Sequence, residues 1–402
     1  MTTPLWRQRE YMLLWSGQVV TTLGAQASGI IYPLLVLALT NSPAQASWAS
    51  ALRMLPYLVL ILPVGVLIDR WDRRRVMLIC HVARGLAVAS LPLAMALDRL
   101  VVGHIYAVAV IEGALHVFFN IAETAALARV VDARRLPQAT AQNQAGFATA
   151  NIVGPALGTW LYQAVGRGFP FVVDAISHAL GAVAIWRLRS SFAPARDAVH
   201  APMVAAVIEG LRWLWRQRVV RDMALITCGA NFVAAALPLL LIVRGREIGA
   251  SEAQIGLVFS LGGLGAIIGA LLGGAMARAL SFGQAIVLSL GVRALCIPLF
   301  LLCPGPWSLG LVWGVAMLFG PLYDVVQFSY RLALIPDGLQ GRVNSGFRLF
   351  AFLLNPAGAA LCGSLLERGG SPWAVAVFGA SCAALALGAR LDPAIRHAVR
   401  PS

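Results

Sequence analysis

Residues 65–78 read GVLIDRWDRRRVML and place a dense group of charges between two long apolar runs. Six of the seven positions from 69 to 75 carry Asp or Arg, in a chain of 402 residues that is 59% hydrophobic and only 12% charged. Each flanking run contains about 20 apolar residues, enough for a helix to cross the roughly 30 Å core of a bilayer. The stretch is therefore predicted to be a loop between two transmembrane helices.

Apolar runs of this length recur along the whole chain, and its mean hydropathy is +0.78. They predict an all-α polytopic membrane protein with twelve transmembrane helices. The expected spans are 13–38, 48–68, 76–97, 101–127, 139–164, 169–188, 222–243, 254–277, 284–303, 308–331, 346–366 and 372–390.

The twelve spans divide into an N-terminal six-helix bundle at 1–190 and a C-terminal bundle at 222–402. The connection at 191–221 is expected to be a cytoplasmic linker. It contains MVAAVIEGLRWLWRQR at 203–218, which is amphipathic and rich in Arg. This pattern predicts a helix on the cytoplasmic membrane face, and the alternative is a solvated linker helix.

The orientation follows from the positions of the arginines, which supply all 31 basic residues. With the N-terminus in the cytoplasm, five arginines fall in outer loops, three fall within spans, and 23 lie on the cytoplasmic side or at its interface. Cytoplasmic loops are enriched in basic residues, so both termini are expected inside, in a plasma (inner) membrane protein. Because the arginines are spread over short loops, the net charge of +14 does not indicate a nucleic-acid partner.

Segments of the first half recur in the second half in the same order, as in duplicated transporter folds. Three pairs of positions correspond: Arg84 and Arg293, Glu123 and Asp324, Pro155 and Pro356. The repeats indicate two pseudo-symmetric bundles. The pairs Arg84–Glu123 and Arg293–Asp324 are interpreted as buried ion pairs with a structural role.

The charged stretch resembles the loop motif Gly-x-Leu-x-Asp-Arg-x-Gly-Arg-Lys of the major facilitator superfamily. The matching residues are Gly65, Leu67, Asp69, Arg70, Arg73 and Arg74, while Asp72 stands where many members have Gly. This variant of the motif, with Asp72 in place of Gly, is similar to that of the branch of macrolide-efflux and enterobactin-exporter-type proteins. The segments 16–28, 136–158 and 335–345 resemble the same branch. The resemblance covers nearly the whole chain and implies two bundles around a central cavity, working by alternating access.

The resemblance also implies a conformational latch formed by Gly65, Asp69, Arg70, Arg73 and Arg74. Gly65 lies one turn before Asp69, where a small residue lets another helix approach. Asp69 is expected to face the positively polarised N-terminus of span 11, and the arginines to pair with carboxylates at neighbouring helix ends. The alternative for the arginines is topology alone, which does not require Asp69.

GPALG at 154–158 resembles part of the Gly-Pro antiporter motif of drug exporters. Gly154, Pro155 and Gly158 agree with that motif, while Thr159 replaces a second Gly. The alternative interpretation is close helix packing together with a proline kink. The two interpretations are compatible, and the resemblance favours export.

Ionisable groups at membrane depth are costly and usually functional, so Glu112 is the first candidate for proton coupling or substrate contact. It lies near the middle of span 4 and shares a helix face with His116, Asn120 and Glu123. Arg84 is expected to lie too shallow to pair with Glu112. His116 is a second candidate on that face, or a hydrogen-bonded group of the interior.

Asp174 is the third candidate, near the outer end of span 6. His178 follows four residues later, and the two form either a titrating pair or a simple ion contact. Similar proteins often carry an acid after the residue that matches Gly24, where Ala25 stands here. This difference shifts the expected coupling role to Glu112 and Asp174.

Polar side chains of spans 1, 7 and 10 are candidates to line a cavity. They are Gln18, Thr22, Gln26, Asn231, Tyr323 and Gln327. An apolar cavity with scattered hydrogen-bonding groups suits an amphiphilic organic molecule. The alternative is that some of these groups bridge helices.

The sequence thus predicts a secondary active transporter that couples protons to the export of a hydrophobic or amphiphilic small molecule. The molecule is expected to be a drug, a macrolide-like compound or a secreted metabolite. The alternatives are a siderophore exporter, a solute importer, or a membrane receptor or assembly protein without transport. No P-loop, nucleophile constellation or metal spacing is found, so neither an enzyme nor a cofactor is expected. The chain is expected to act as a monomer in the bilayer.

Overall fold

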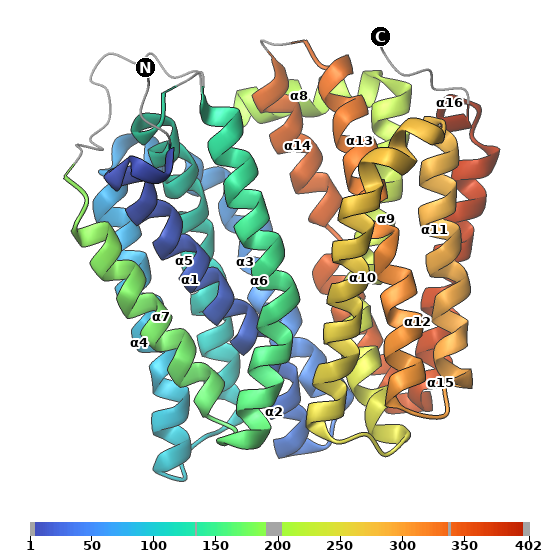
Figure 1. Cartoon of the computed structure of the whole chain (residues 1–402), viewed down its shortest axis with the longest axis horizontal. Helices are drawn as coiled ribbons and strands as arrows, with labels where there is room; N and C mark the ends of the chain where they lie inside the picture. Colours follow the sequence, from blue (N-terminus) through green and yellow to red (C-terminus); the bar gives the residue numbers. More distant parts are fainter. Residues whose placement is uncertain (1–4, 133–134, 190–202, 337–338, 397–402) are drawn as a thin grey trace. The chain divides into compact units, whose positions relative to one another are not determined.

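The computed structural model describes residues 5–132, 135–189, 203–336 and 339–396, and every regular element in them is a helix. The predicted all-α fold is confirmed (Figure 1). The α-helices are α1 (Arg9–Gly29), α2 (Ile31–Thr40), α3 (Pro43–Arg70), α4 (Arg73–Ala96), α5 (Val102–Val130), α6 (Leu136–Ala164), α7 (Phe169–Trp186), α8 (Met203–Arg216), α9 (Arg218–Glu247), α10 (Glu252–Ala279), α11 (Phe282–Leu299), α12 (Pro306–Leu318), α13 (Gly320–Leu334), α14 (Gln340–Phe352), α15 (Asn355–Leu391) and α16 (Pro393–Arg396).

These helices cover the twelve predicted spans. By length and composition, nine helical stretches of the described residues could cross a membrane, and the longest, 342–391, contains the last two spans. Gly370 has φ 65° inside α15 and separates these two spans, because that backbone conformation breaks the helix.

Three predicted spans are interrupted within their length. The interruptions lie at Ile30 between α1 and α2, at Phe319 between α12 and α13, and at Leu353–Leu354 between α14 and α15. A proline follows each of them by two or three residues, at Pro33, Pro321 and Pro356. Proline has no amide hydrogen to give to the preceding turn, so the helix is weakened there.

Local capping fixes several helix starts. Both α10 and α11 begin with a capping box. The side chain of a serine accepts a hydrogen bond from the backbone amide of the glutamine three residues later, and the side chain of that glutamine accepts one from the serine amide. In α10, the Ser251 amide donates to Gln254 Oε1 over 2.8 Å. These contacts satisfy amides that a helix N-terminus otherwise leaves without partners.

The chain divides into two compact units. The N-terminal unit holds residues 1–39 and 52–200, and the C-terminal unit holds 40–51 and 201–402. Helix α3 therefore begins in the C-terminal unit and continues in the N-terminal unit. The domain limits expected from the sequence, at 190 and 222, remain predictions, and they did not anticipate that 40–51 would join the C-terminal unit.

Glycines allow the helices of the N-terminal unit to approach closely. A Cβ atom added to Gly158 of α6 would collide with the backbone carbonyl of Ala27 in α1, and one added to Gly154 would collide with Gln26. Helix α6 continues through Pro155. Residues 154 and 158 therefore lie where α6 packs closely against α1 within this unit.

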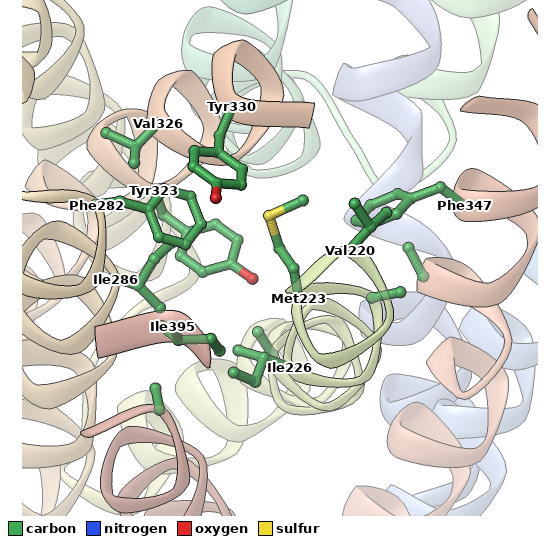
Figure 2. Packing of buried hydrophobic residues seen from close by; sticks show 14 of the residues in the cluster. Val220, Met223, Ile226, Phe282, Ile286, Tyr323, Val326, Tyr330, Phe347 and Ile395 are labelled. Atoms are coloured by element: carbon green, nitrogen blue, oxygen red, sulfur yellow. The ribbon is translucent and has the colours of Figure 1, made fainter. Parts of the chain in front are cut away.

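The core of the C-terminal unit gathers side chains from α9, α11, α13 and α14. Figure 2 shows Tyr323 and Tyr330 of α13 facing Met223 of α9. Both tyrosines are only 8% exposed. The six cysteines of the chain are free and buried.

Helix α8 forms within the segment where a linker helix was predicted, and one of its faces packs against α14. A Cβ atom on Gly210 would collide with the backbone at Arg342, and the Arg342 side chain binds Glu209 over 2.6 Å. Figure 1 shows α8 running across one end of α14. This face is covered by protein, so only the remaining faces are available to lipid or water.

The segment 40–51 is held in the C-terminal unit by Glu367 of α15. The Glu367 carboxylate accepts hydrogen bonds from the Ser42 hydroxyl (2.6 Å) and from the Ala44 amide (2.9 Å). It therefore caps the N-terminus of α3, where the helix dipole favours an anion. One turn earlier in α15, Gly363 lies in close contact with Ser47 of α3.

Candidate functional site

The charged stretch at 65–78 forms a very short connection between α3 and α4. Asp72 caps α4, and its Oδ1 atom accepts from the amides of Arg74 (2.9 Å) and Arg75 (3.1 Å). Sequence reasoning did not assign this role, although an Asp directly before a helical run is a common cap. The cap fixes where the second helix begins.

The other residues of the predicted latch have different surroundings. Gly65 is buried, Arg70 is exposed, and Arg73 is only 8% exposed. Arg74 donates to the carbonyls of Ile185 (3.2 Å) and Trp186 at the end of α7. Arg74 was expected to pair with a carboxylate, but it binds the negatively polarised end of a helix instead. The side chain of Asp69 lies outside the described part of the structure.

Glu112 of α5 lies between two guanidinium groups inside the N-terminal unit. Its Oε1 atom is 2.7 Å from Nη2 of Arg53 in α3 and 3.1 Å from Nη2 of Arg84 in α4. The Glu112 side chain is 1% exposed, and Arg53 also donates to the carbonyl of Ala25. Three helices are therefore joined by one carboxylate.

This arrangement corrects two predictions. Arg84 was placed too shallow to reach Glu112, and it was expected to pair with Glu123. In the structure Arg84 binds Glu112, while Glu123 accepts a hydrogen bond from Asn143 over 3.3 Å. The expected depths of Arg84 and Glu112 in the membrane were counted from the ends of the predicted spans. The packing of the helices brings the two residues to the same level instead.

Asp174 of α7 is fully buried and has no guanidinium partner among the described residues. Its Oδ2 atom accepts from the Ser28 hydroxyl over 2.6 Å, and its Oδ1 atom is 3.6 Å from Nε2 of His178. The Nδ1 atom of His178 lies 3.2 Å from Nδ1 of His81 in α4. One of these rings must donate and the other accept, so the contact depends on a specific distribution of protons.

Small residues make room for this network. Gly24 of α1 faces Ser177 and Asp174, and a Cβ atom there would lie 2.9 Å from the Asp174 carboxylate. Gly181 of α7 similarly faces His81. The network therefore forms where α1, α4 and α7 approach closely. Sequence reasoning found Asp174 and His178 but missed His81 and Ser28, which lie far away in the sequence.

His116 lies one turn after Glu112 and is exposed. The four residues predicted to share one face of α5 therefore differ in burial. Glu112 and Glu123 are buried, Asn120 is partly buried, and His116 is exposed. The structure does not place His116 in the ion-pair cluster.

Three of the six predicted cavity residues bridge helices inside their own unit. Gln26 donates to Asn151, Asn231 donates to the carbonyl of Ala351 (3.0 Å), and Tyr323 shares a hydrogen bond with Thr227 (2.7 Å). Gln327 accepts from Arg331, and a buried oxygen of Gln18 has no hydrogen-bond partner among the described residues. Thr22 is partly buried. The alternative interpretation, that these groups join helices, is correct for Gln26, Asn231 and Tyr323.

The second predicted ion pair does not form. In the described residues, Asp324 of α13 is exposed, and Nε of Arg293 in α11 is buried without a hydrogen-bond partner. Arg293 lies near the interruption between α12 and α13, where its Nη2 would be 3.9 Å from a Cβ on Gly320. The two halves thus differ at corresponding positions. No group of His, Cys, Asp and Glu in the described ranges could hold a metal ion.

Comparison with known proteins gives the family context of these sites. The sequence model of the Major Facilitator Superfamily matches residues 14–320. The chain is 27% identical over 352 residues to the multidrug efflux pump Tap of Mycolicibacterium fortuitum, a match that covers 85% of each protein. It is 27% identical over 343 residues to the enterobactin exporter EntS of Escherichia coli O1:K1, covering 84% of this chain and 80% of the exporter.

Solved structures show the same fold. A bacterial homologue of the human lysosomal transporter Spinster matches with a TM-score of 0.70 and 12% identity, over 98% of this chain and 96% of that one. The nucleoside transporter NupG matches with a TM-score of 0.75 and 12% identity, over 95% and 98%. At this identity the similarity concerns the arrangement of helices.

Proposed function

Since the chain belongs to the Major Facilitator Superfamily of membrane transporters, we propose that it is a secondary active transporter that exports amphiphilic small molecules in exchange for protons. The observation that carries the proposal is the similarity to an efflux pump and to an exporter over more than four fifths of the chain. Import, and a role without transport, have no comparable support. A siderophore as substrate is the second candidate, favoured by the enterobactin exporter among the relatives.

Asp174 is the proposed site of proton exchange. A carboxyl group that couples to protons must exist in both protonation states without breaking the fold. Protonation of Glu112 would leave Arg53 and Arg84 buried without a counter-charge, which is strongly unfavourable. In the described part of the structure, the Asp174 carboxylate accepts from the Ser28 hydroxyl and lies beside the His178 imidazole, and it has no ion pair with an arginine. We therefore assign Glu112 a structural role and give the coupling role to Asp174.

Transport into inverted membrane vesicles tests this function. Vesicles containing the chain should accumulate a fluorescent amphiphile when an inward-acid proton gradient is imposed, and dissipating the gradient with a protonophore should stop accumulation. Vesicles without the chain provide the background. Accumulation that persists without the gradient would contradict proton coupling, and no accumulation of any tested amphiphile would contradict export.

The latch role of Asp69 is retained as a proposal. An acid at a helix N-terminus contributes about 1 kcal/mol, so Asp69→Asn should reduce the population of the outward-open state and lower transport several-fold. Membrane insertion should stay unchanged. Flux per molecule of inserted protein measures the effect, and Asp132→Asn, at an exposed acid after α5, is the control. Equal flux in the Asp69 and Asp132 variants would remove the latch role.

The proposed setting is the plasma membrane, with both termini in the cytoplasm. The stretch 65–78 then lies on the cytoplasmic side, together with α8. The chain is proposed to act as a monomer whose partners are its substrate, protons and the surrounding lipid.

A further inference from the structure

Two buried histidines of the N-terminal unit have no part in the function proposed so far. They are His81 of α4 and His178 of α7. Their Nδ1 atoms lie 3.2 Å apart, and Nε2 of His178 is 3.6 Å from Oδ1 of Asp174. The three side chains therefore form a row, which begins at the carboxyl group proposed for proton exchange.

The row leads from Asp174 towards the end of the unit where α4 begins. Helices α4 and α7 are antiparallel, because Arg74 near the start of α4 binds the carbonyl of Ile185 near the end of α7. His81 lies seven residues after Arg74, and His178 lies seven residues before Ile185, so the two rings meet at one level. At 1.5 Å per residue, this level is about 10 Å from the Arg74 contact, and Asp174 lies about 6 Å beyond it.

The hydrogen bond between the rings fixes which nitrogen atoms carry protons. A neutral imidazole has one donor and one acceptor nitrogen, so one Nδ1 atom donates and the other accepts. When Nδ1 of His178 donates, its Nε2 atom has a free lone pair, which suits a protonated Asp174. When Nδ1 of His81 donates, Nε2 of His178 carries the proton and suits the ionised carboxylate. Each protonation state of Asp174 therefore fits one direction of the imidazole hydrogen bond.

The Nε2 atom of His178 is the unsatisfied member of the row. It is buried and has no hydrogen-bond partner among the described residues. Its distance of 3.6 Å from the Asp174 carboxylate is longer than an ordinary hydrogen bond. Leaving a buried polar atom without a partner costs free energy. A small approach of the two side chains would satisfy this atom and complete the row.

Charged groups beside the row favour neutral rings. Arg84 follows His81 by one turn on α4. Its guanidinium lies 3.1 Å from Glu112, which also binds Arg53. A guanidinium makes a second positive charge on a neighbouring buried ring unfavourable. A neutral ring passes a proton on instead of holding it, as a transfer between two places requires.

The far end of the row is the Nε2 atom of His81. A Cβ atom added to Gly181 of α7 would lie 3.0 Å from it. Gly181 is three residues nearer to the end of α7 than His178 is. Nε2 of His81 therefore lies on the side of the ring pair that is away from Asp174, towards the start of α4.

We propose that His178 and His81 relay the proton that Asp174 gives up. This inference rests on the proposed function and names the groups through which its coupling site is emptied. The Asp174 carboxyl gives its proton to Nε2 of His178, and the Nδ1 proton of His178 passes to Nδ1 of His81. Nε2 of His81 gives its own proton to water admitted from the side where α4 begins. One proton enters the row, one leaves it, and the imidazole hydrogen bond is reversed.

Transport by the full-length chain in proteoliposomes separates a relay from a structural role. His81→Asn keeps a hydrogen-bonding group near the position of Nδ1, but its amide does not pass protons in the working pH range. Uptake driven by a proton gradient should fall about a hundredfold, the lower limit for the loss of a general acid–base group. Exchange of labelled for unlabelled substrate without a gradient should stay near the unmodified rate. His178→Asn should separate the two assays in the same way.

His104→Asn is the matched control and should change neither assay. His104 of α5 is another hydrogen-bonded histidine of this unit, and its Nε2 atom lies 2.8 Å from the Ser90 hydroxyl. Unchanged gradient-driven uptake in His81→Asn would overturn the relay. Equal losses in both assays would also overturn it, because the ring would then only support the packing of α4 and α7. No gradient-driven uptake by the unmodified chain would instead contradict the proposed function, so the two failures are distinguishable.

Discussion

Replacing Asp174 by Asn is expected to abolish transport driven by a proton gradient, down to the background of vesicles without the chain. Asn has the size of Asp and can still accept from the Ser28 hydroxyl, which now binds Asp174 over 2.6 Å, so the fold should survive. It cannot gain or lose a proton in the working pH range, so the coupling step is lost. Uptake driven by a proton gradient is the measurement.

A second assay separates coupling from substrate binding. Exchange of labelled for unlabelled substrate across the membrane, with no gradient, should continue in Asp174→Asn. Glu123→Gln is the matched control, since Glu123 is also a buried acid of the N-terminal unit and accepts from Asn143. Gradient-driven transport at the unmodified rate in Asp174→Asn, or an equal loss in Glu123→Gln, would show that Asp174 is not the coupling group.

The largest loss of stability is expected for Glu112→Gln. Glu112 is the shared counter-charge of Arg53 and Arg84, at 2.7 Å and 3.1 Å. Removing the charge strands two guanidinium groups, and breaking a buried ion pair typically costs 3–5 kcal/mol. We expect about 3 kcal/mol, since the Arg53 side chain is 25% exposed and water can partly solvate it.

Thermal unfolding of the purified chain in detergent measures this effect. The melting temperature of Glu112→Gln should fall well below that of the unmodified chain. His116→Ala changes an exposed residue one turn later on the same helix and should leave the melting temperature nearly unchanged. Equal melting temperatures for all three proteins would mean that the carboxylate does not hold the three helices together.

The helices of this chain could be predicted from the sequence because lipid imposes one strong condition. Every backbone group in the hydrocarbon must be satisfied within its own segment, so each apolar run of sufficient length becomes a helix. Interruptions within three spans were missed, although Pro33, Pro321 and Pro356 marked them. The packing of α8 on α14 was also missed, because an amphipathic pattern does not say whether lipid or protein covers its apolar face.

The charged sites were only partly predictable. Counting residues identified Glu112, Asp174 and Arg84 as intramembrane charges, but not which of them meet. The Glu112 cluster depends on Arg53, one of the three arginines that fall within predicted spans. The Asp174 network depends on His81, about ninety positions earlier in the sequence. Such contacts arise from the packing of different helices. The spacing of residues within one helix predicts which of them share a face, but not which residues of another helix they meet.

One helix shared by two units has a mechanical consequence. The first turns of α3 are fastened to Glu367 in the C-terminal unit, and its later turns belong to the N-terminal unit. Any rotation between the units must therefore release that carboxylate or bend α3. Pro56 and Pro63 lie inside the helix beyond the boundary, and each deprives the carbonyl four residues earlier of its amide donor. Bending of α3 requires the least free energy near these prolines, so we expect α3 to be a flexible connection and not a rigid one.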